Sequence, residues 1–286
     1  YRPVVGEYAG EPVTVTSTGI GSPSAAIAVE ELARVGANTF LRVGSCGAIQ
    51  RNVDVGDLVI TTGAVRQEGT SDEYVREDYP ASAHGEVVTA LVTAAERLGH
   101  EYHLGVTCST DSFYAGQSRP GVDGFRAADS DDRIEALREA GVLNFEMEAS
   151  AILTLAGLYG LRAGAVRTVY ANRVTGEFRT EGQRKAAGPA ALAAALGTPA
   201  ASCADLVITL SGSASAAVTL PRPMTPLALA SSRGNPPIHW WNTVVTETSV
   251  GRYSSPRAAI SRIAATSCTR FPTWPYPSVT LRTPWV

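Results

Sequence analysis

The fold class follows from residues 12–47, which read PVTVTSTGIGSPSAAIAVEELARVGANTFLRVGSCG. Residues 12–18 alternate between apolar and polar side chains, as a half-buried strand does. After a glycine turn, Ser22-Pro23 has the residue types of a helix N-cap and a first helical position. Residues 39–43 predict a second, buried strand that ends in a small-residue turn. A strand, a helix and a strand in this order indicate an α/β domain.

The same alternation continues to about residue 171. The sequence predicts helices at 84–98, 132–140 and 148–158, and strands at 57–62, 103–108, 142–145 and 161–171. This order predicts a mostly parallel or mixed sheet covered by helices. Because the loops that leave the strand ends form the sites of such folds, we expect functional residues directly after the strands.

Composition and charge argue against several classes of protein. The 286 residues are 44% hydrophobic, which is enough for a sizeable core, and the formal net charge is -3. This charge offers no basic surface for nucleic acid, and no apolar run approaches the roughly 18 residues of a membrane span. The first residues lack a secretory signal pattern, so we expect a cytoplasmic protein. The four cysteines are scattered, so we expect neither a metal site nor a disulfide framework.

The composition changes in the last third of the chain. Of the 27 acidic residues only Asp205 and Glu247 lie beyond residue 199, whereas all four tryptophans do. This stretch shows no sustained helical or strand period. We therefore interpret residues 1–190 as one domain and residues 191–286 as an irregular tail, produced by reading a GC-rich gene in a shifted frame. A genuine appended domain is the alternative.

Residues 41–47 have the composition of an oxyanion site at a strand end. Arg42 supplies a guanidinium that binds phosphate through two parallel hydrogen bonds. Gly44 and Ser45 supply unhindered backbone N–H groups and a hydroxyl. The alternative is a structural Arg42 that pairs with a carboxylate of the core.

A second candidate segment follows the strand that ends near residue 108. The amide of Gln117 and the guanidinium of Arg119 together complement the edge of a uracil ring, and Phe113 offers a stacking face. On these residues alone, a solvated loop is the alternative.

A third candidate segment stands where a strand meets a helix. Glu146 and Glu148 are two residues apart and point in different directions, so they do not fit a glycosidase pair. A carboxylate accepts two hydrogen bonds from a ribose diol, and Met147 supplies an apolar face for the sugar. Plain carboxylates at a helix start are the alternative.

The turn Gly19-x-Gly21-x-x-Ser24 lies where a dinucleotide fingerprint would lie, between a strand and a helix. Ser24 replaces the third glycine, and no acidic residue follows at the distance that binds a ribose. We interpret the segment as a tight turn before a helix. A dinucleotide-dependent oxidoreductase is the rival function.

Taken in order, these segments resemble the motifs of the hexameric nucleoside phosphorylase family, in its uridine-cleaving branch. The resemblance spans residues 1 to about 190, in the segments 16–24, 27–32, 39–50, 105–119, 144–149 and 160–173. It implies a three-layer α/β/α fold with a central mixed sheet flanked by helices. It also implies a pentosyltransferase that reversibly converts uridine and phosphate to uracil and ribose 1-phosphate, in nucleoside catabolism and pyrimidine salvage.

The resemblance further implies that no cofactor is needed, since phosphate is a co-substrate. The other expected partners are uridine and further copies of the chain, in a hexamer built as a trimer of dimers. No covalent intermediate forms: phosphate attacks the anomeric carbon while hydrogen bonds stabilise the leaving uracil.

Carried over by position, the family's functional residues fall on the segments described above. The phosphate ligands are Arg42, Gly44 and Ser45; the base is held by Phe113, Gln117, Arg119 and Arg173; the ribose is held by Ser45, Glu146, Met147 and Glu148. The residues that carry catalysis are Arg42, Ser45, Gln117, Arg119 and Glu148.

The chain departs from the family pattern at its N-terminus, at residue 46 and in the final helix, which Gly188-Pro189 interrupts. The family's N-terminal phosphate loop would precede residue 1, and Cys46 stands where bacterial members usually have threonine. Asn172-Arg173 stands where the purine branch has an aspartate, which favours a pyrimidine substrate. The alternatives are another nucleoside phosphorylase, a nucleosidase, or an impaired chain that only binds nucleoside.

Overall fold

The computed structural model describes residues 3–8, 11–178 and 206–211. All of them belong to one compact unit, Tyr1–Leu229. The strands are β1 (Val4–Tyr8), β2 (Glu11–Gly19), β3 (Thr39–Ala48), β4 (Leu58–Gln67), β5 (Ala81–Ser82), β6 (Tyr102–Thr110), β7 (Asn144–Glu146), β8 (Arg162–Asn172) and β9 (Leu206–Ser211). The helices are α1 (Ser22–Arg34), α2 (Gly85–Leu98), α3 (Ser130–Glu139) and α4 (Ala149–Leu158), with short 3₁₀ turns at Ser71–Glu73 and Val122–Gly124.

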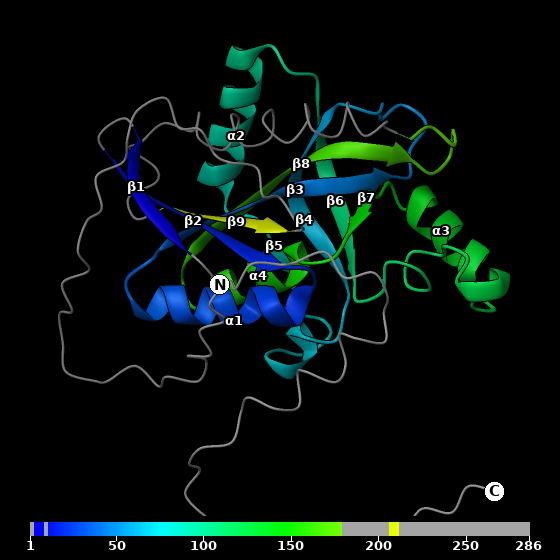
Figure 1. Ribbon diagram of the computed structural model, residues 1–286, viewed down its shortest axis with the longest axis horizontal. Coiled ribbons are helices and arrows are strands. Elements are labelled where there is room, and N and C mark those ends of the chain that lie inside the picture. Colours follow the sequence, from blue (N-terminus) through cyan, green and yellow to red (C-terminus); the bar gives the residue numbers. More distant parts are fainter. Residues whose placement is uncertain (1–2, 9–10, 179–205, 212–286) are drawn as a thin grey trace, which may run out of the picture. The chain divides into compact units, whose positions relative to one another are not determined.

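The described strands form one mixed sheet with helices on both faces. Helix α2 covers one face, and α1 and α4 pack together on the other (Figure 1). The predicted three-layer α/β/α fold is therefore confirmed. None of the described helices is long and apolar enough to cross a membrane.

The apolar faces of the helices explain how each helix layer packs on the sheet. Val87, Leu91 and Ala95 recur every four residues along α2 and contact the buried strand residues Leu58 and Val166. Helix α4 is buried along most of its length, because it lies between the sheet and α1. Burial of these side chains on both faces holds the sheet, and with it the strand ends, in place.

Five strands pair in a closed circuit, in the order β3, β8, β4, β6, β7 and back to β3. Each of these strands contributes a buried polar residue whose side chain faces the others, namely Arg42, Arg167, Thr61, Thr107 and Glu146. The circuit thus gathers polar groups that are far apart in the sequence.

Strand β3 is longer than expected. It was predicted to turn at Gly44, but it continues to Ala48 because β8 pairs with it over its whole length. A register shift between Cys46 and Gly47 is the one irregularity along this pairing. The predicted turn is therefore wrong, and Gly44 and Ser45 lie within a strand.

The chain between β2 and α1 also differs in detail from the prediction. Gly21, not Ser22, is the N-cap residue of α1, with φ 99°. Ser22 is the first helical residue, and its hydroxyl donates to the carbonyl oxygen of Met147 at 2.9 Å. The side chain that was expected to cap the helix instead joins α1 to the segment before α4.

Strand β9 comes from the range that was interpreted as an irregular tail. It lies between β2 and β3 and pairs parallel with both, Val13 and Thr39 each being opposite Leu206. For Leu206–Ser211 the interpretation is wrong, because a six-residue segment is too short to show a period but long enough to pair. The predicted boundary near residue 190 lies outside the described residues.

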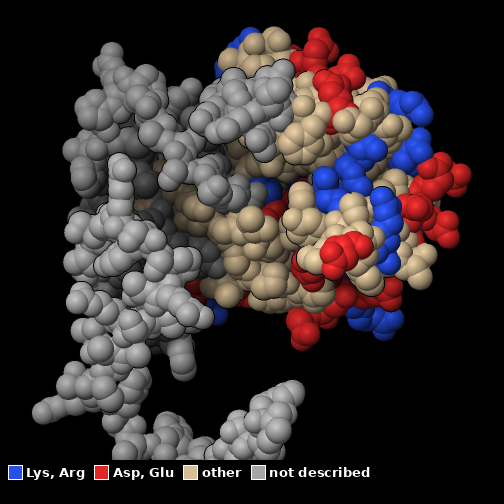
Figure 2. Space-filling view, turned by 45° about the vertical axis from the view of Figure 1, so that its right-hand side comes forward, with Lys and Arg blue, Asp and Glu red and all other residues tan. Residues whose placement is uncertain are grey.

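The described surface carries both signs of charge. Basic and acidic side chains lie side by side over the face shown in Figure 2. Such mixing agrees with the small net charge of the whole chain, -3.

Candidate active site

Arg42 lies at the centre of the candidate site, on β3. Its side chain is 1% exposed, donates through Nη2 to Glu148, and donates through Nη1 to the Val43 carbonyl oxygen at 2.6 Å. Gly44 makes room for this guanidinium, since a Cβ there would lie 2.1 Å from Nη1. The guanidinium therefore folds back over its own strand only because residue 44 has no side chain.

Glu148 joins Arg42 to the N-terminal end of α1. Its Oε2 accepts from Arg42, and its Oε1 accepts from the backbone N–H of Gly21 at 2.7 Å. The glycine turn that resembled a dinucleotide fingerprint is thus used to donate a backbone hydrogen bond to a carboxylate. A cofactor-binding role is not needed to explain its glycines.

Glu146 is the more heavily bonded of the two carboxylates. It accepts from the Ser109 hydroxyl and from the backbone N–H groups of Glu148 and Ala149 at the start of α4, at 3.0–3.1 Å. The guanidinium groups of Arg42 and Arg167 lie 3.7 and 3.4 Å away. Burial alone would raise the pKa of Glu146, but the two guanidinium groups and these hydrogen bonds outweigh it and lower the pKa below its ordinary value.

The predicted base-reading loop is held by Arg173. Its guanidinium donates to the carbonyl oxygens of Gln117 at 2.6 Å and Ser118 at 3.3 Å, and Ser118 has a φ of 54°. This contact fixes the loop so that Gln117 is buried and the guanidinium of Arg119 lies 4.3 Å over the ring of Phe113. Phe113 keeps 46% of its surface exposed.

The base-reading loop and the Arg42 strand meet at Gly47. A Cβ at Gly47 would lie 3.4 Å from Arg119 Nη2 and 3.8 Å from Arg173 Cγ, and the backbone N–H of Arg173 donates to Ala48 at 2.8 Å. Burial lowers the pKa of Arg119, and burial together with the neighbouring Arg119 and Arg126 lowers that of Arg173 to about 10. For Arg173, partial burial and the repulsion of two neighbouring cations both disfavour the charged form.

The structure thus arranges the predicted residues in two adjoining groups. Arg42, Glu146 and Glu148 are in direct contact, while Gln117, Arg119, Phe113 and Arg173 form the second group beside Gly47. Ser45 is half-buried on β3, and Met147 is half-buried between the two glutamates. Arg42 pairs with two buried carboxylates, as the core-pairing alternative expected. The same guanidinium is the one that was predicted to bind phosphate.

The sequence did not single out Arg167. Its side chain is 0% exposed, and Nη1 donates to Thr61 at 2.5 Å and to Thr107 at 3.2 Å. An arginine in the middle of the predicted buried strand 161–171 was the signal that could have revealed it, because an isolated buried charge needs a partner.

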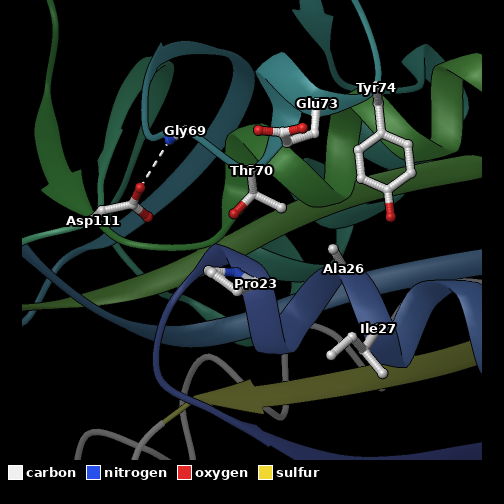
Figure 3. A pocket seen from close by; sticks show the side chains of 8 residues that line it. All are labelled: Pro23, Ala26, Ile27, Gly69, Thr70, Glu73, Tyr74 and Asp111. Carbon is white, nitrogen blue, oxygen red and sulfur yellow. Dashed lines mark hydrogen bonds between the residues drawn. The ribbon is translucent and has the colours of Figure 1, made fainter. Parts of the chain in front are cut away.

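A hollow of about 620 Å³ opens beside the site. Its wall consists of Pro23, Ala26 and Ile27 from α1 and of Gly69, Thr70, Glu73, Tyr74 and Asp111 opposite them (Figure 3). Asp111 accepts from the Gly69 backbone N–H at 2.8 Å. None of the predicted site residues lines this hollow.

Cys46 cannot replace the hydroxyl of a threonine as a strong donor. The thiol is buried, and burial raises its pKa to about 12, so it stays neutral at physiological pH. A neutral thiol is only a weak hydrogen-bond donor. Within the described part of the chain, no group of three or more His, Cys, Asp or Glu could hold a metal ion.

Comparisons with known proteins show which family the chain resembles. The family model of the phosphorylase superfamily matches residues 1–198. A uridine phosphorylase of Thermococcus kodakarensis is 58% identical over 187 residues, which are 65% of this chain and 68% of that protein. A uridine phosphorylase of Escherichia coli is 46% identical over 173 residues, or 60% of this chain and 68% of that protein. A guanosine phosphorylase of Halorubrum lacusprofundi is also 46% identical, over 176 residues, or 62% of this chain and 68% of that protein.

Proposed function

Because the chain belongs to the phosphorylase superfamily, we propose that it cleaves uridine with inorganic phosphate, giving uracil and ribose 1-phosphate. The observation that carries the proposal is the contact, at Gly47, between the base-reading loop and the strand that bears Arg42. A nucleoside bound across this contact has its base beside Arg119 and its sugar beside the glutamates. Phosphate then lies at Arg42, below the sugar.

Arg42 and Ser45 bind the phosphate. Glu148 accepts a hydrogen bond from the guanidinium of Arg42 and so orients the cation for phosphate. Arginine suits this role because its planar fork forms two parallel hydrogen bonds to phosphate oxygens. Gly44 keeps that fork free of a side-chain clash.

Glu148 is the principal ribose ligand. Glu146 already accepts from Ser109 and from two backbone N–H groups, whereas Glu148 accepts from Gly21 and Arg42 alone among the bonds described. A carboxylate has about four acceptor positions, so Glu148 has more capacity left for sugar hydroxyls. Met147 packs against the sugar from the segment between them.

Gln117 and Arg119 bind the base, and Phe113 stacks on it. The Nε atom of Arg119 is buried and has no hydrogen-bond partner among the described residues, so a carbonyl oxygen of uracil would satisfy it. Donation to that oxygen stabilises the negative charge that uracil gains as the glycosidic bond breaks. The reaction needs no cofactor, because the phosphate itself is the nucleophile.

The hydrogen bonds of Asn172 favour a pyrimidine nucleoside over a purine nucleoside as the substrate. Its amide donates to Gln50 at 2.8 Å and Val53 at 2.9 Å, while its side-chain oxygen accepts from the backbone N–H groups of Val174 and Thr175. These bonds lock Asn172 into the chain at the end of β8. It is therefore not free to protonate or bind a purine ring.

Guanosine is the second candidate substrate, because the guanosine phosphorylase is as similar to this chain as the Escherichia coli enzyme is. The test measures base release from uridine and from guanosine, each with and without phosphate. We expect phosphate-dependent uracil release and at least about tenfold lower kcat/KM for guanosine, as when a pocket lacks one hydrogen bond to a charged group. Faster release from guanosine would overturn the substrate, and release without phosphate would indicate a nucleosidase.

Arg119→Met locates the base site in the same assay. We expect kcat/KM for uridine to fall by at least about tenfold, because one charged hydrogen bond to the leaving base is lost. Arg34→Met, at an exposed arginine that pairs with Glu30 at 3.5 Å, is the control. An equal loss in both variants would contradict the assignment of Arg119.

We also propose that the chain works in the cytoplasm, in pyrimidine salvage, as a hexamer built as a trimer of dimers. The partly exposed side chains of Ile27 and Tyr74 line the hollow beside the site and would be covered by a neighbouring copy. Light scattering after gel filtration measures the assembly. A monomer that is fully active would contradict the need for this assembly.

A further inference from the structure

Arg167 lies beneath the candidate site, on β8. It is directly opposite Gly44 in the parallel pairing with β3 and opposite Val59 in the antiparallel pairing with β4. Its side chain is 0% exposed, which is rare for an arginine. The polar partners of Arg167 are Thr61, Thr107 and Glu146, so its effect on the reaction passes through these neighbours.

The neighbours of Arg167 indicate its role. Nη1 donates to Thr61 and Thr107, and Nε lies 3.4 Å from Glu146 Oε2 without forming a well-aligned hydrogen bond. Nη2 has no hydrogen-bond partner among the described residues. Two nitrogen atoms of Arg167, Nε and Nη2, thus have no hydrogen-bond acceptor among the described residues, and the side chain contributes mainly its charge. The carboxylate that pairs with this charge is Glu146.

The charges of the group formed by Arg42, Glu146 and Glu148 balance only when Arg167 is included. Two carboxylates, Glu146 and Glu148, are buried beside two guanidinium groups, Arg42 and Arg167. Arg42 contacts both carboxylates, whereas Arg167 contacts Glu146. Without Arg167, Arg42 would be the one guanidinium beside two buried negative charges, and an incoming phosphate would add more.

We propose that Arg167 is a positioning residue that neutralises Glu146 and so leaves Arg42 available to the phosphate. The proposal rests on the proposed function, since phosphate is the ligand of Arg42 there. Glu146 in turn accepts the first N–H groups of α4 and fixes the segment that carries Glu148. Arg167 therefore supports the anion site and the sugar site through a single carboxylate.

The titration of Glu146 agrees with this role. After burial, which opposes ionisation, Arg167 has the largest effect on the pKa of Glu146, ahead of Arg42. Burial also lowers the pKa of Arg167 itself, and the nearby Glu146 raises it again. The two groups thus keep one another charged.

The experiment measures the dissociation constant of inorganic phosphate by calorimetry, for the full chain and for Arg167→Met. We expect at least about tenfold weaker phosphate binding, because Arg42 is then held by two unbalanced carboxylates instead of being shared with the ligand. The KM for uridine should change less than that for phosphate. Arg162→Met, on the same strand but beside the surface residue Glu86, is the matched control and should bind phosphate as the parent does.

Two further variants distinguish a loss of charge balance from a loss of packing. In Glu146→Gln with Arg167→Met the charge pair is removed together, so phosphate binding should return to within about threefold of the parent value, near the error of such comparisons. Arg167→Lys keeps the charge and should also stay within about threefold. If Arg167→Met does not fold, these two variants decide the question.

Each outcome bears on one proposal. Unchanged phosphate binding in folded Arg167→Met, or a loss of tenfold or more that persists in the double variant, would overturn the role of Arg167. A parent chain that neither binds phosphate nor releases uracil would instead overturn the proposed function.

Discussion

Gly44 shows how a residue without a side chain determines the position of a charge. The Arg42 guanidinium occupies the space above Gly44, where a Cβ would lie 2.1 Å from Nη1 and 2.9 Å from Cζ. Interior packing tolerates no such approach, so the two groups exclude one another. The backbone conformation of Gly44 is not the reason, since it lies within a strand.

Gly44→Ala should therefore displace Arg42 and weaken phosphate binding by about tenfold or more, the loss of one charged hydrogen bond. Gly63→Ala is the control, because its Cβ would come no closer than 3.4 Å to the Ala81 carbonyl oxygen. Calorimetric titration measures the phosphate affinity of both variants, and thermal melting shows whether they are folded. Equal phosphate affinities in the two folded variants would refute the spatial argument.

The two buried thiols predict how stability depends on alkaline pH. Burial raises the pKa of Cys46 and of Cys108 from 9.0 to about 12. Because the folded pKa is the higher one, this stability is complete below pH 9 and is lost as the pH rises from about 9 to about 12. Each thiol should then cost about 1 kcal/mol per pH unit above 9.

The check is the melting temperature of the parent and of Cys108→Val between pH 7 and pH 11. Cys108 packs among apolar residues such as Ile49 and Phe145, so valine suits the site. We expect parallel curves up to about pH 8.5 and a steeper fall for the parent above it. Identical slopes across the whole range would show that the Cys108 thiol does not contribute.

At the scale of elements, the contact between α2 and β8 depends on Gly164. A Cβ at this position would lie 2.4 Å from Cγ1 of Val87 and 3.5 Å from Cδ1 of Leu91. Both residues belong to the apolar face of α2 that covers the sheet. A strand glycine here lets the helix approach closely enough to seal that face.

Gly164→Ala should lower the free energy of unfolding by about 1–3 kcal/mol, the usual cost of overpacking a core. Gly85→Ala at the start of α2 is the matched control, since nothing lies within 4 Å of its Cβ. Urea titration of both variants measures the difference. A Gly164→Ala variant as stable as Gly85→Ala would mean that α2 moves away at no cost.

For the whole molecule, the main question is how the sheet is completed between β2 and β3. Strand β9 pairs parallel with both, although it follows the range 1–198 that matches the family model. A strand with neighbours on both sides satisfies backbone groups that would otherwise be open along two edges. The six residues of β9 therefore matter to the fold more than their length indicates.

Two shortened chains test this contribution. A chain ending at residue 229 keeps the compact unit and should melt close to the parent temperature. A chain ending at residue 205 lacks β9 and should melt at least about 3 °C lower, as expected for a loss of 1 kcal/mol or more in a domain of this size. Equal melting temperatures would show that β9 does not stabilise the sheet, in keeping with the interpretation of 191–286 as an irregular tail.

The sequence by itself determined the order of most elements and indicated the segments that are expected to carry chemistry. The helix at 84–98 and the strands at 103–108 and 161–171 lie where their apolar periodicity placed them, because periodicity is a local property. The residue types of Arg42, Gln117 and Glu148 likewise indicated oxyanion, base and sugar ligands before any contact was known.

The tertiary structure alone decided which of these groups meet. Arg42 and Glu148 are 106 residues apart, and Arg167 reaches Glu146 across a circuit of five strands. Strand pairing also carried β3 past its glycine and placed β9 between β2 and β3. Such pairings depend on burial and hydrogen bonding between distant segments, and no local pattern of side chains encodes them.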